Sequence, residues 1–138
     1  GIAEGVLHGG CLSILAESLG TPYAHRIAAH ILFLEDIGTK PYQWDRMLLH
    51  LRYSGVFKEV YGIIFGDMRQ CVTAEENDYL ERAILHSLRA FEGPIAIGLH
   101  SGHVGTPNIT LPLGVAVKLD LAEAGNPRMH FLEAAVTI

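Results

Sequence analysis

The stretch Ile31-Leu32-Phe33-Leu34-Glu35-Asp36 decides the fold, because four consecutive apolar residues end abruptly in two carboxylates. A continuous apolar run of this kind is typical of a strand that is covered on both faces, as strands of parallel sheets are. Residues 60–65 and 95–99 repeat the pattern further along the chain. Val6-Leu7 is a shorter candidate, which we expect Gly9-Gly10 to end.

Apolar residues at helical spacing separate these runs. The three stripes consist of Leu12, Leu15, Ala16 and Leu19, then Trp44, Met47, Leu48 and Leu51, and then Leu80, Ala83, Ile84, Leu88 and Phe91. The third helix is predicted to begin at Thr73, because Glu76 three residues later completes a capping box. Beyond His100 the pattern changes to strict alternation over residues 115–121, followed by a turn signal at 125–127 and renewed alternation at 129–131. The sequence therefore predicts an α/β fold with a largely parallel sheet and a C-terminal antiparallel hairpin.

Composition limits the chain to a few classes of protein. With 138 residues and 49% hydrophobic residues, it is predicted to form a single domain over 1–138, and no apolar run reaches the ~18 residues of a membrane helix. The net charge of −5 and the scattered basic residues argue against nucleic acid or a membrane as a partner. Cys11 and Cys71 fit neither a zinc site nor a disulfide framework, so a reducing compartment is expected. The chain opens with Gly1 in place of Met, and we expect it to be a piece of a longer protein.

Ionisable residues follow two of the predicted strands. Ligands of open α/β sheets collect beyond the carboxyl ends of the strands, where Glu35 and the loop with His103 both fall. Because these ends lie on one edge of a parallel sheet, Glu35 and His103 are predicted to meet although they are far apart in the chain. A carboxylate beside an imidazole fixes the tautomer of the ring and stabilises the imidazolium, which is the base half of a nucleophilic triad.

Other interpretations of the same residues stay open at this point. The Glu35-Asp36 pair is also typical of a solvated strand end or a helix cap, and a histidine in a glycine-rich loop is often a turn residue. His100 with His103, or His25 with His30, is a candidate pair of metal ligands. Neither pair has a third ligand at a clear spacing, so we expect no metal and no cofactor.

Five blocks of sequence carry a resemblance to a known family. They are Gly9-Gly10-Cys11-Leu12-Ser13-Ile14-Leu15, Leu19-Gly20-Thr21-Pro22-Tyr23, Ile31-Leu32-Phe33-Leu34-Glu35-Asp36, Asp45-Arg46-Met47-Leu48, and Gly102-His103 with Asn108-Ile109-Thr110-Leu111-Pro112-Leu113-Gly114. In this order they resemble the C-terminal domain of the LD-carboxypeptidases, the muramoyltetrapeptide carboxypeptidases, which have microcin-immunity serine peptidases as relatives. The resemblance covers nearly the whole chain and implies a swivelling β/β/α-type domain.

The resemblance also implies a Ser-Glu-His triad that is divided between two domains. Glu35 matches the glutamate of the family, and His103 matches the histidine of its Gly-His motif. The nucleophilic serine belongs to an N-terminal flavodoxin-like domain, which is absent from this chain. Members cleave the L,D-amide before a terminal D-alanine of cytoplasmic muropeptides during peptidoglycan recycling. The resemblance thus implies an inactive isolated domain, whose partners are its own N-terminal domain, a muropeptide substrate and a second copy in a homodimer.

One departure from the family concerns substrate binding. The family usually has Gly-Gly-Asn-Leu where this chain has Gly9-Gly10-Cys11-Leu12. If that asparagine binds substrate, Cys11 occupies a substrate-binding position; alternatively, it begins a helix as a small buried residue. Ser101 is a second candidate for substrate binding. Two alternative functions also stay open: a binding or oligomerisation module without chemistry, and a microcin-immunity-like peptidase domain.

Overall fold

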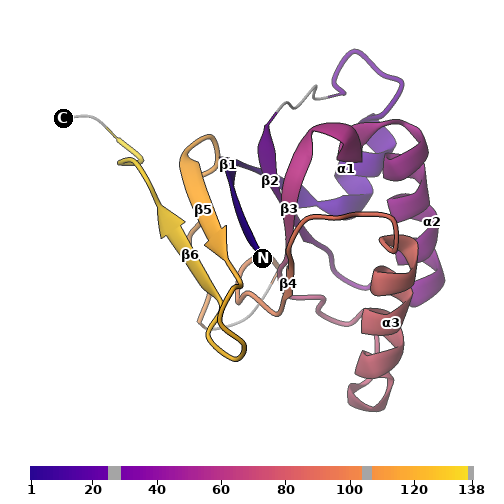
Figure 1. Cartoon of the computed structure of the whole chain (residues 1–138). Coiled ribbons are helices and arrows are strands. Elements are labelled where there is room, and N and C mark those ends of the chain that lie inside the picture. The colour runs from indigo at the N-terminus through magenta and orange to yellow at the C-terminus, as the bar shows by residue number, and fades with distance from the viewer. Residues whose placement is uncertain (25–28, 104–106, 137–138) are drawn as a thin grey trace.

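Within the residues described by the computed structural model (1–24, 29–103 and 107–136), six strands form one sheet with helices packed on one face (Figure 1). The strands are β1 (Ile2–Cys11), β2 (His30–Glu35), β3 (Val60–Phe65), β4 (Ile95–Ile97), β5 (Ala116–Asp120) and β6 (Arg128–Phe131). The α-helices are α1 (Leu12–Ser18), α2 (Pro41–Tyr53) and α3 (Asn77–Ser87), and the 3-10 turns are η1 (Val56–Glu59) and η2 (Ala74–Glu76). The predicted α/β fold is confirmed.

The strand order is β4-β3-β2-β1-β5-β6, with β1 to β4 parallel and the last two strands antiparallel. The C-terminal hairpin therefore joins the sheet beside β1, at the opposite side from β4, as Figure 1 shows. The parallel register places Cys11, the last residue of β1, directly opposite Glu35, the last residue of β2. The carboxyl ends of the central strands consequently share one edge, as the sequence predicts.

The first strand is longer than predicted, and the reason lies in its glycines. We expected Gly9-Gly10 to end a strand at Val6-Leu7, whereas β1 runs from Ile2 to Cys11. A Cβ at Gly9 would overlap the carbonyl oxygen of Phe33, and Gly9 has a φ of +128° that side chains disfavour. Gly9 therefore allows β1 to lie close against β2, and the expectation that Gly9-Gly10 ends the strand is wrong.

Two other boundaries also differ from the prediction. The strand expected over 95–99 stops at Ile97, because Gly98 adopts a φ of +97° and leaves the extended conformation. The third helix, expected from Thr73, begins with the turn η2 and becomes α-helical only at Asn77. Glu76 does reach back to Thr73, whose backbone N–H and hydroxyl donate to Glu76 Oε2 at 3.1 and 3.2 Å. One half of the capping box therefore forms around a 3-10 turn.

The central strands β2 and β3 are buried on both faces, which explains their continuous apolar sequences. On the helix side, Leu32, Leu34 and Phe65 pack with Trp44 and other residues of the helices. The opposite face buries a second cluster, made of Leu7, Ile31, Phe33, Ile64, Val117 and Leu119. Full burial of such a side chain contributes about 1.5–3 kcal/mol to the free energy of unfolding, so these clusters stabilise the sheet and hold its edge in place. No helix in the described part of the chain combines the length and apolar character needed to cross a membrane.

Candidate active site

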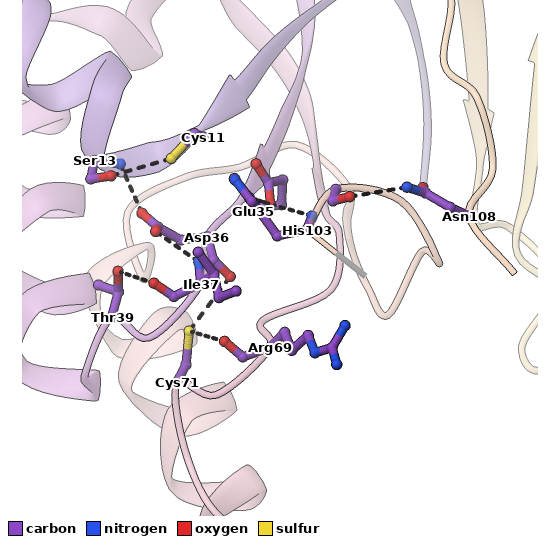
Figure 2. A network of polar contacts seen from close by, with 11 residues as sticks. Cys11, Ser13, Glu35, Asp36, Ile37, Thr39, Arg69, Cys71, His103 and Asn108 are labelled. Carbon is purple, nitrogen blue, oxygen red and sulfur yellow. Dashed lines mark hydrogen bonds and ion pairs between the residues drawn. The ribbon is translucent and has the colours of Figure 1, made fainter. Parts of the chain in front are cut away.

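Glu35 and His103, which the sequence predicts to meet, lie in direct contact (Figure 2). Glu35 ends β2, and its side chain is only 6% exposed. Its Oε2 atom accepts two hydrogen bonds from His103, at 2.7 Å from the ring Nδ1 and at 2.9 Å from the backbone N–H. Two hydrogen bonds to one oxygen fix both the ring and the peptide of His103 against the end of β2.

The pair can act as a carboxylate-oriented base. An ionised carboxylate only accepts hydrogen bonds, so Nδ1 of His103 carries the proton and Nε2 of the neutral ring has a free lone pair. The carboxylate is buried, whereas 48% of the His103 side chain is exposed. A reacting group that approaches from outside therefore meets the basic nitrogen, while Glu35 stabilises the imidazolium that forms when a proton is taken.

Gly102 makes this contact possible, although the sequence identifies it only as the glycine of the Gly-His motif. Its φ is +118°, and a Cβ at this position would lie 2.5 Å from Glu35 Oε2. A side chain would therefore push the loop away from the carboxylate. The available signal was the glycine immediately before the candidate histidine, in the Gly-His motif.

Asp36, the second carboxylate of the pair, has a structural role. It is 3% exposed, with Oδ2 accepting the backbone N–H of Ser13 at 2.9 Å and Oδ1 accepting that of Ile37 at 2.8 Å. Asp36 thus caps the first turn of α1 from a distant part of the chain. The helix-cap interpretation of the Glu-Asp pair holds for Asp36, and Glu35 is left to contact His103.

Both cysteines lie near this network (Figure 2). Cys11 is half-buried at the N-terminus of α1, with its Sγ 3.2 Å from the hydroxyl of Ser13. Cys71 is fully buried, and its Sγ lies 3.6 Å from the carbonyl oxygens of Asp36 and Arg69. Burial raises the pKa of the Cys71 thiol, and the charge of Asp36 adds to the rise. Cys71 is therefore a neutral, packed thiol.

Ser101, the other candidate for substrate binding, is buried beside the site. Its side chain donates to the carbonyl of Ile109 at 2.8 Å, and its backbone carbonyl accepts from Asp67 at 3.1 Å. Through these two hydrogen bonds, Ser101 therefore helps to hold the loop that carries His103 in place. Substrate binding by Cys11 and by Ser101 stays a prediction.

Among the histidines considered as metal ligands, those that the structure describes do not converge. His100 pairs with Asp67, at 3.5 Å between Nδ1 and Oδ2, and so faces a different carboxylate from His103. His30 begins β2, at the other end of the strand from Glu35, and stacks on His8 with 5.6 Å between ring centroids. His25 lies outside the described residues. Over the ranges that the structure covers, no three His, Cys, Asp or Glu side chains gather as a metal site would require.

A small recess lies at the loop that carries His103. It has a volume of about 380 Å³ and includes Gly10, Phe33, Gly102 and Asn108 in its lining. A larger recess of about 890 Å³ lies at the opposite end of the strands, around Ile2, Tyr61 and Pro94. The smaller recess is the one of interest for chemistry, because Gly102, which precedes His103 in the chain, lines it.

Comparison with known proteins gives a consistent result. The family model described as the LD-carboxypeptidase C-terminal domain matches residues 4–119. The chain is 37% identical over 125 residues to the probable murein peptide carboxypeptidase of Bacillus subtilis, covering 89% of this chain and 39% of the relative. It is 36% identical over 118 residues to the murein tetrapeptide carboxypeptidase of Pseudomonas aeruginosa, covering 85% and 38%. The chain thus spans about two-fifths of the length of these relatives.

Solved structures resemble this fold closely. The muramoyltetrapeptide carboxypeptidase from Oxalobacter formigenes superimposes with a TM-score of 0.79 at 36% identity, covering 94% of this chain and 45% of that one. The microcin C7 self-immunity protein MccF superimposes with a TM-score of 0.85 at 27% identity, covering 99% and 40%. Both likenesses extend over nearly all of the chain.

Proposed function

This chain belongs to the LD-carboxypeptidase C-terminal domain family, and from that premise we propose that it supplies Glu35 and His103 to a Ser-Glu-His triad. The observation that carries the proposal is the 2.7 Å contact between Glu35 Oε2 and His103 Nδ1, with the carboxylate buried and the ring half exposed. The serine would come from an N-terminal flavodoxin-like domain of a longer protein. The chain's coverage of only about two-fifths of its relatives is consistent with such a domain.

In the proposed reaction, Nε2 of His103 takes the proton of the serine as its oxygen attacks the scissile carbonyl. Glu35 holds the ring through Nδ1 and stabilises the resulting imidazolium. The imidazolium then returns the proton to the amine that leaves, and a water molecule repeats the sequence to release the acyl group.

The substrate that we propose is a muropeptide, cleaved at the L,D-amide before a terminal D-alanine. Relatives at 36% and 37% identity are named as murein peptide carboxypeptidases, which supports this substrate class. Such a reaction belongs to peptidoglycan recycling in the cytoplasm. A homodimer remains a prediction.

The test uses the full-length protein that contains this chain. We expect Glu35→Gln and His103→Ala each to lower kcat on a tetrapeptide ending in D-alanine by about three orders of magnitude or more. Asp67→Asn and His100→Ala are the matched controls, because they remove the looser, more exposed acid–imidazole pair at the same edge. The controls should stay within a few-fold of the parent. Near-normal activity of either Glu35→Gln or His103→Ala would remove the assignment.

A second substrate class has a specific observation in its favour. The superposition on MccF gives the higher TM-score, 0.85, and one MccF structure holds glutamyl sulfamoyl guanosine. The same Glu35–His103 pair would then act on an acyl sulfamoyl nucleoside. Assaying the full-length protein on both compounds decides between them, because turnover of the nucleoside conjugate without turnover of the tetrapeptide would replace the muropeptide proposal.

A further inference from the structure

The peptide group between Gly102 and His103 is hydrogen-bonded on both sides. Its carbonyl, which belongs to Gly102, accepts the side-chain amide of Asn108 at 3.1 Å. Its N–H, which belongs to His103, donates to Glu35 Oε2 at 2.9 Å. A single planar unit is thus held between Asn108 and the candidate catalytic carboxylate, as Figure 2 shows.

This arrangement couples Asn108 to the imidazole. Because a peptide group is rigid, fixing the direction of the Gly102 carbonyl also fixes the direction of the His103 N–H. A hydrogen bond to the carbonyl polarises the peptide and strengthens the hydrogen bond that the N–H donates. The His103 N–H and the ring Nδ1 share Glu35 Oε2, so rotation of the peptide would carry both away from the carboxylate.

Asn108 is itself held in place by its neighbours. The backbone N–H of Ile109 donates to the carbonyl of His100 at 2.7 Å, and the Ser101 hydroxyl donates to the carbonyl of Ile109 at 2.8 Å. These bonds tie the segment after Asn108 to the start of the loop, and Ser101 is buried. The backbone next to Asn108 is therefore held in place, although the Asn108 side chain itself is exposed.

We propose that Asn108 is a positioning residue for His103: its amide clamps the Gly102–His103 peptide so that Glu35 can hold the ring in the Nδ1–H tautomer. The contribution of this clamp to catalysis rests on the proposed function, whereas its effect on the ring and the peptide does not. The experiment therefore needs one measurement on the ring and one on the reaction.

The first measurement is NMR of the chain at a pH where the ring is neutral. In Asn108→Ala we expect the His103 amide to lose about tenfold of its protection from hydrogen exchange, as the loss of one hydrogen bond implies. Ring ¹⁵N shifts should move from the Nδ1–H toward the Nε2–H tautomer. Amides of β2 and β3 should keep their protection, because the exposed Asn108 side chain contributes nothing to the core.

Two further variants sharpen this measurement. Asn108→Asp keeps the size of the side chain but replaces the donor by a carboxylate facing a carbonyl, so it should equal or exceed the effect of Asn108→Ala. Asn126→Ala is the matched control, since it removes another exposed asparagine, one that donates to Glu123 at 2.9 Å near the β5–β6 turn. Unchanged exchange and tautomer in both Asn108 variants would overturn the proposal.

The second measurement is activity in the full-length protein. We expect Asn108→Ala to lower kcat about tenfold with KM within about twofold, because the clamp acts on the base and not on substrate binding. A rise in KM alone would overturn the positioning role in favour of substrate contact. Activity retained in Glu35→Gln would instead remove the proposed function, and the NMR result would still decide whether Asn108 positions the ring.

Discussion

Gly102 and Glu35 are in such close contact that the loop can approach the carboxylate only without a side chain at position 102. We expect Gly102→Ala to displace the loop and to abolish measurable activity of the full-length protein. The same substitution should lower the free energy of unfolding by about 1–3 kcal/mol. The matched control is Gly125→Ala, because Gly125 also has a positive φ, of +78°, but has no atom within 4 Å of an added Cβ. Denaturant unfolding and kcat would be measured for both; equal activity of the two variants would contradict the prediction.

Cys71 is buried and Cys11 is half-buried, so the reactivity of the two thiols can be compared as a test of burial. Burial raises the pKa of the Cys71 thiol above its ordinary value of 9.0, so the thiolate that reacts with alkylating reagents is scarce and shielded. We expect one thiol per native chain to react rapidly at pH 8, and Cys11→Ser to remove that reaction. Rapid labelling of two thiols without unfolding would show that Cys71 is accessible.

The same thiol predicts how stability depends on pH. Because the folded pKa of Cys71 lies above the unfolded one, its contribution is fully present below pH about 9 and is lost as pH rises through the folded value. The free energy of unfolding should therefore fall above pH about 9, and less steeply in Cys71→Ala. Identical slopes in the parent and the variant would assign the fall to other groups.

At the level of single residues, the sequence predicted that Glu35 and His103 meet, but it did not predict which residues hold them together. The contact between Glu35 and His103 follows from parallel strand ends sharing one edge, which topology alone dictates. The roles of Gly102 and Asn108 depend on close approach and on the orientation of one peptide. The Gly-His motif points to position 102, but neither the close approach nor the peptide orientation can be derived from local spacing. The helix-cap interpretation of the Glu-Asp pair could be assigned to Asp36 only once α1 was placed beside it.

Between elements, a part-buried hydrogen bond joins α2 and α3. The Ser87 hydroxyl lies 2.6 Å from Asp45 Oδ1 and 2.8 Å from the carbonyl of Ala83, and Ser87 is fully buried. We expect Ser87→Ala to lower the free energy of unfolding by about 1–3 kcal/mol, because it leaves the carboxylate of Asp45 without this donor. Ser54→Ala, an exposed position after α2, should change it by less than about 0.5 kcal/mol. Equal effects in urea unfolding would contradict this account.

The helices and strands were predictable where one sequence pattern, such as a continuous apolar run, dominated. The strands β2 and β3 are continuously apolar because both faces are covered, so their bounds follow from composition. Only Val6 and Leu7 of β1 carry that signal, and its glycines resemble a turn until β2 is placed beside them. The antiparallel hairpin was evident from alternation, but its position beside β1 depends on long-range packing that local patterns do not contain.

For the molecule as a whole, the division of the proposed triad between two domains predicts that this domain alone is catalytically inactive. We expect the pure 138-residue chain to trim a tetrapeptide at least about 10⁴-fold more slowly than the full-length protein, since it would lack the nucleophile. Both proteins would be assayed at equal concentration with release of D-alanine as the readout. Efficient trimming by the chain alone would show that its own residues suffice and would contradict a divided triad.

The hydrogen bonds between His103 and Glu35 span 68 positions of the chain. Closing so long a segment costs entropy that only a nearly finished sheet offsets, and contacts of this range slow folding. During synthesis, Glu35 emerges long before His103, and α2, β3, α3 and β4 must be made in between. A nascent or partly unfolded polypeptide in which this contact has not formed therefore carries both side chains without their joint reactivity.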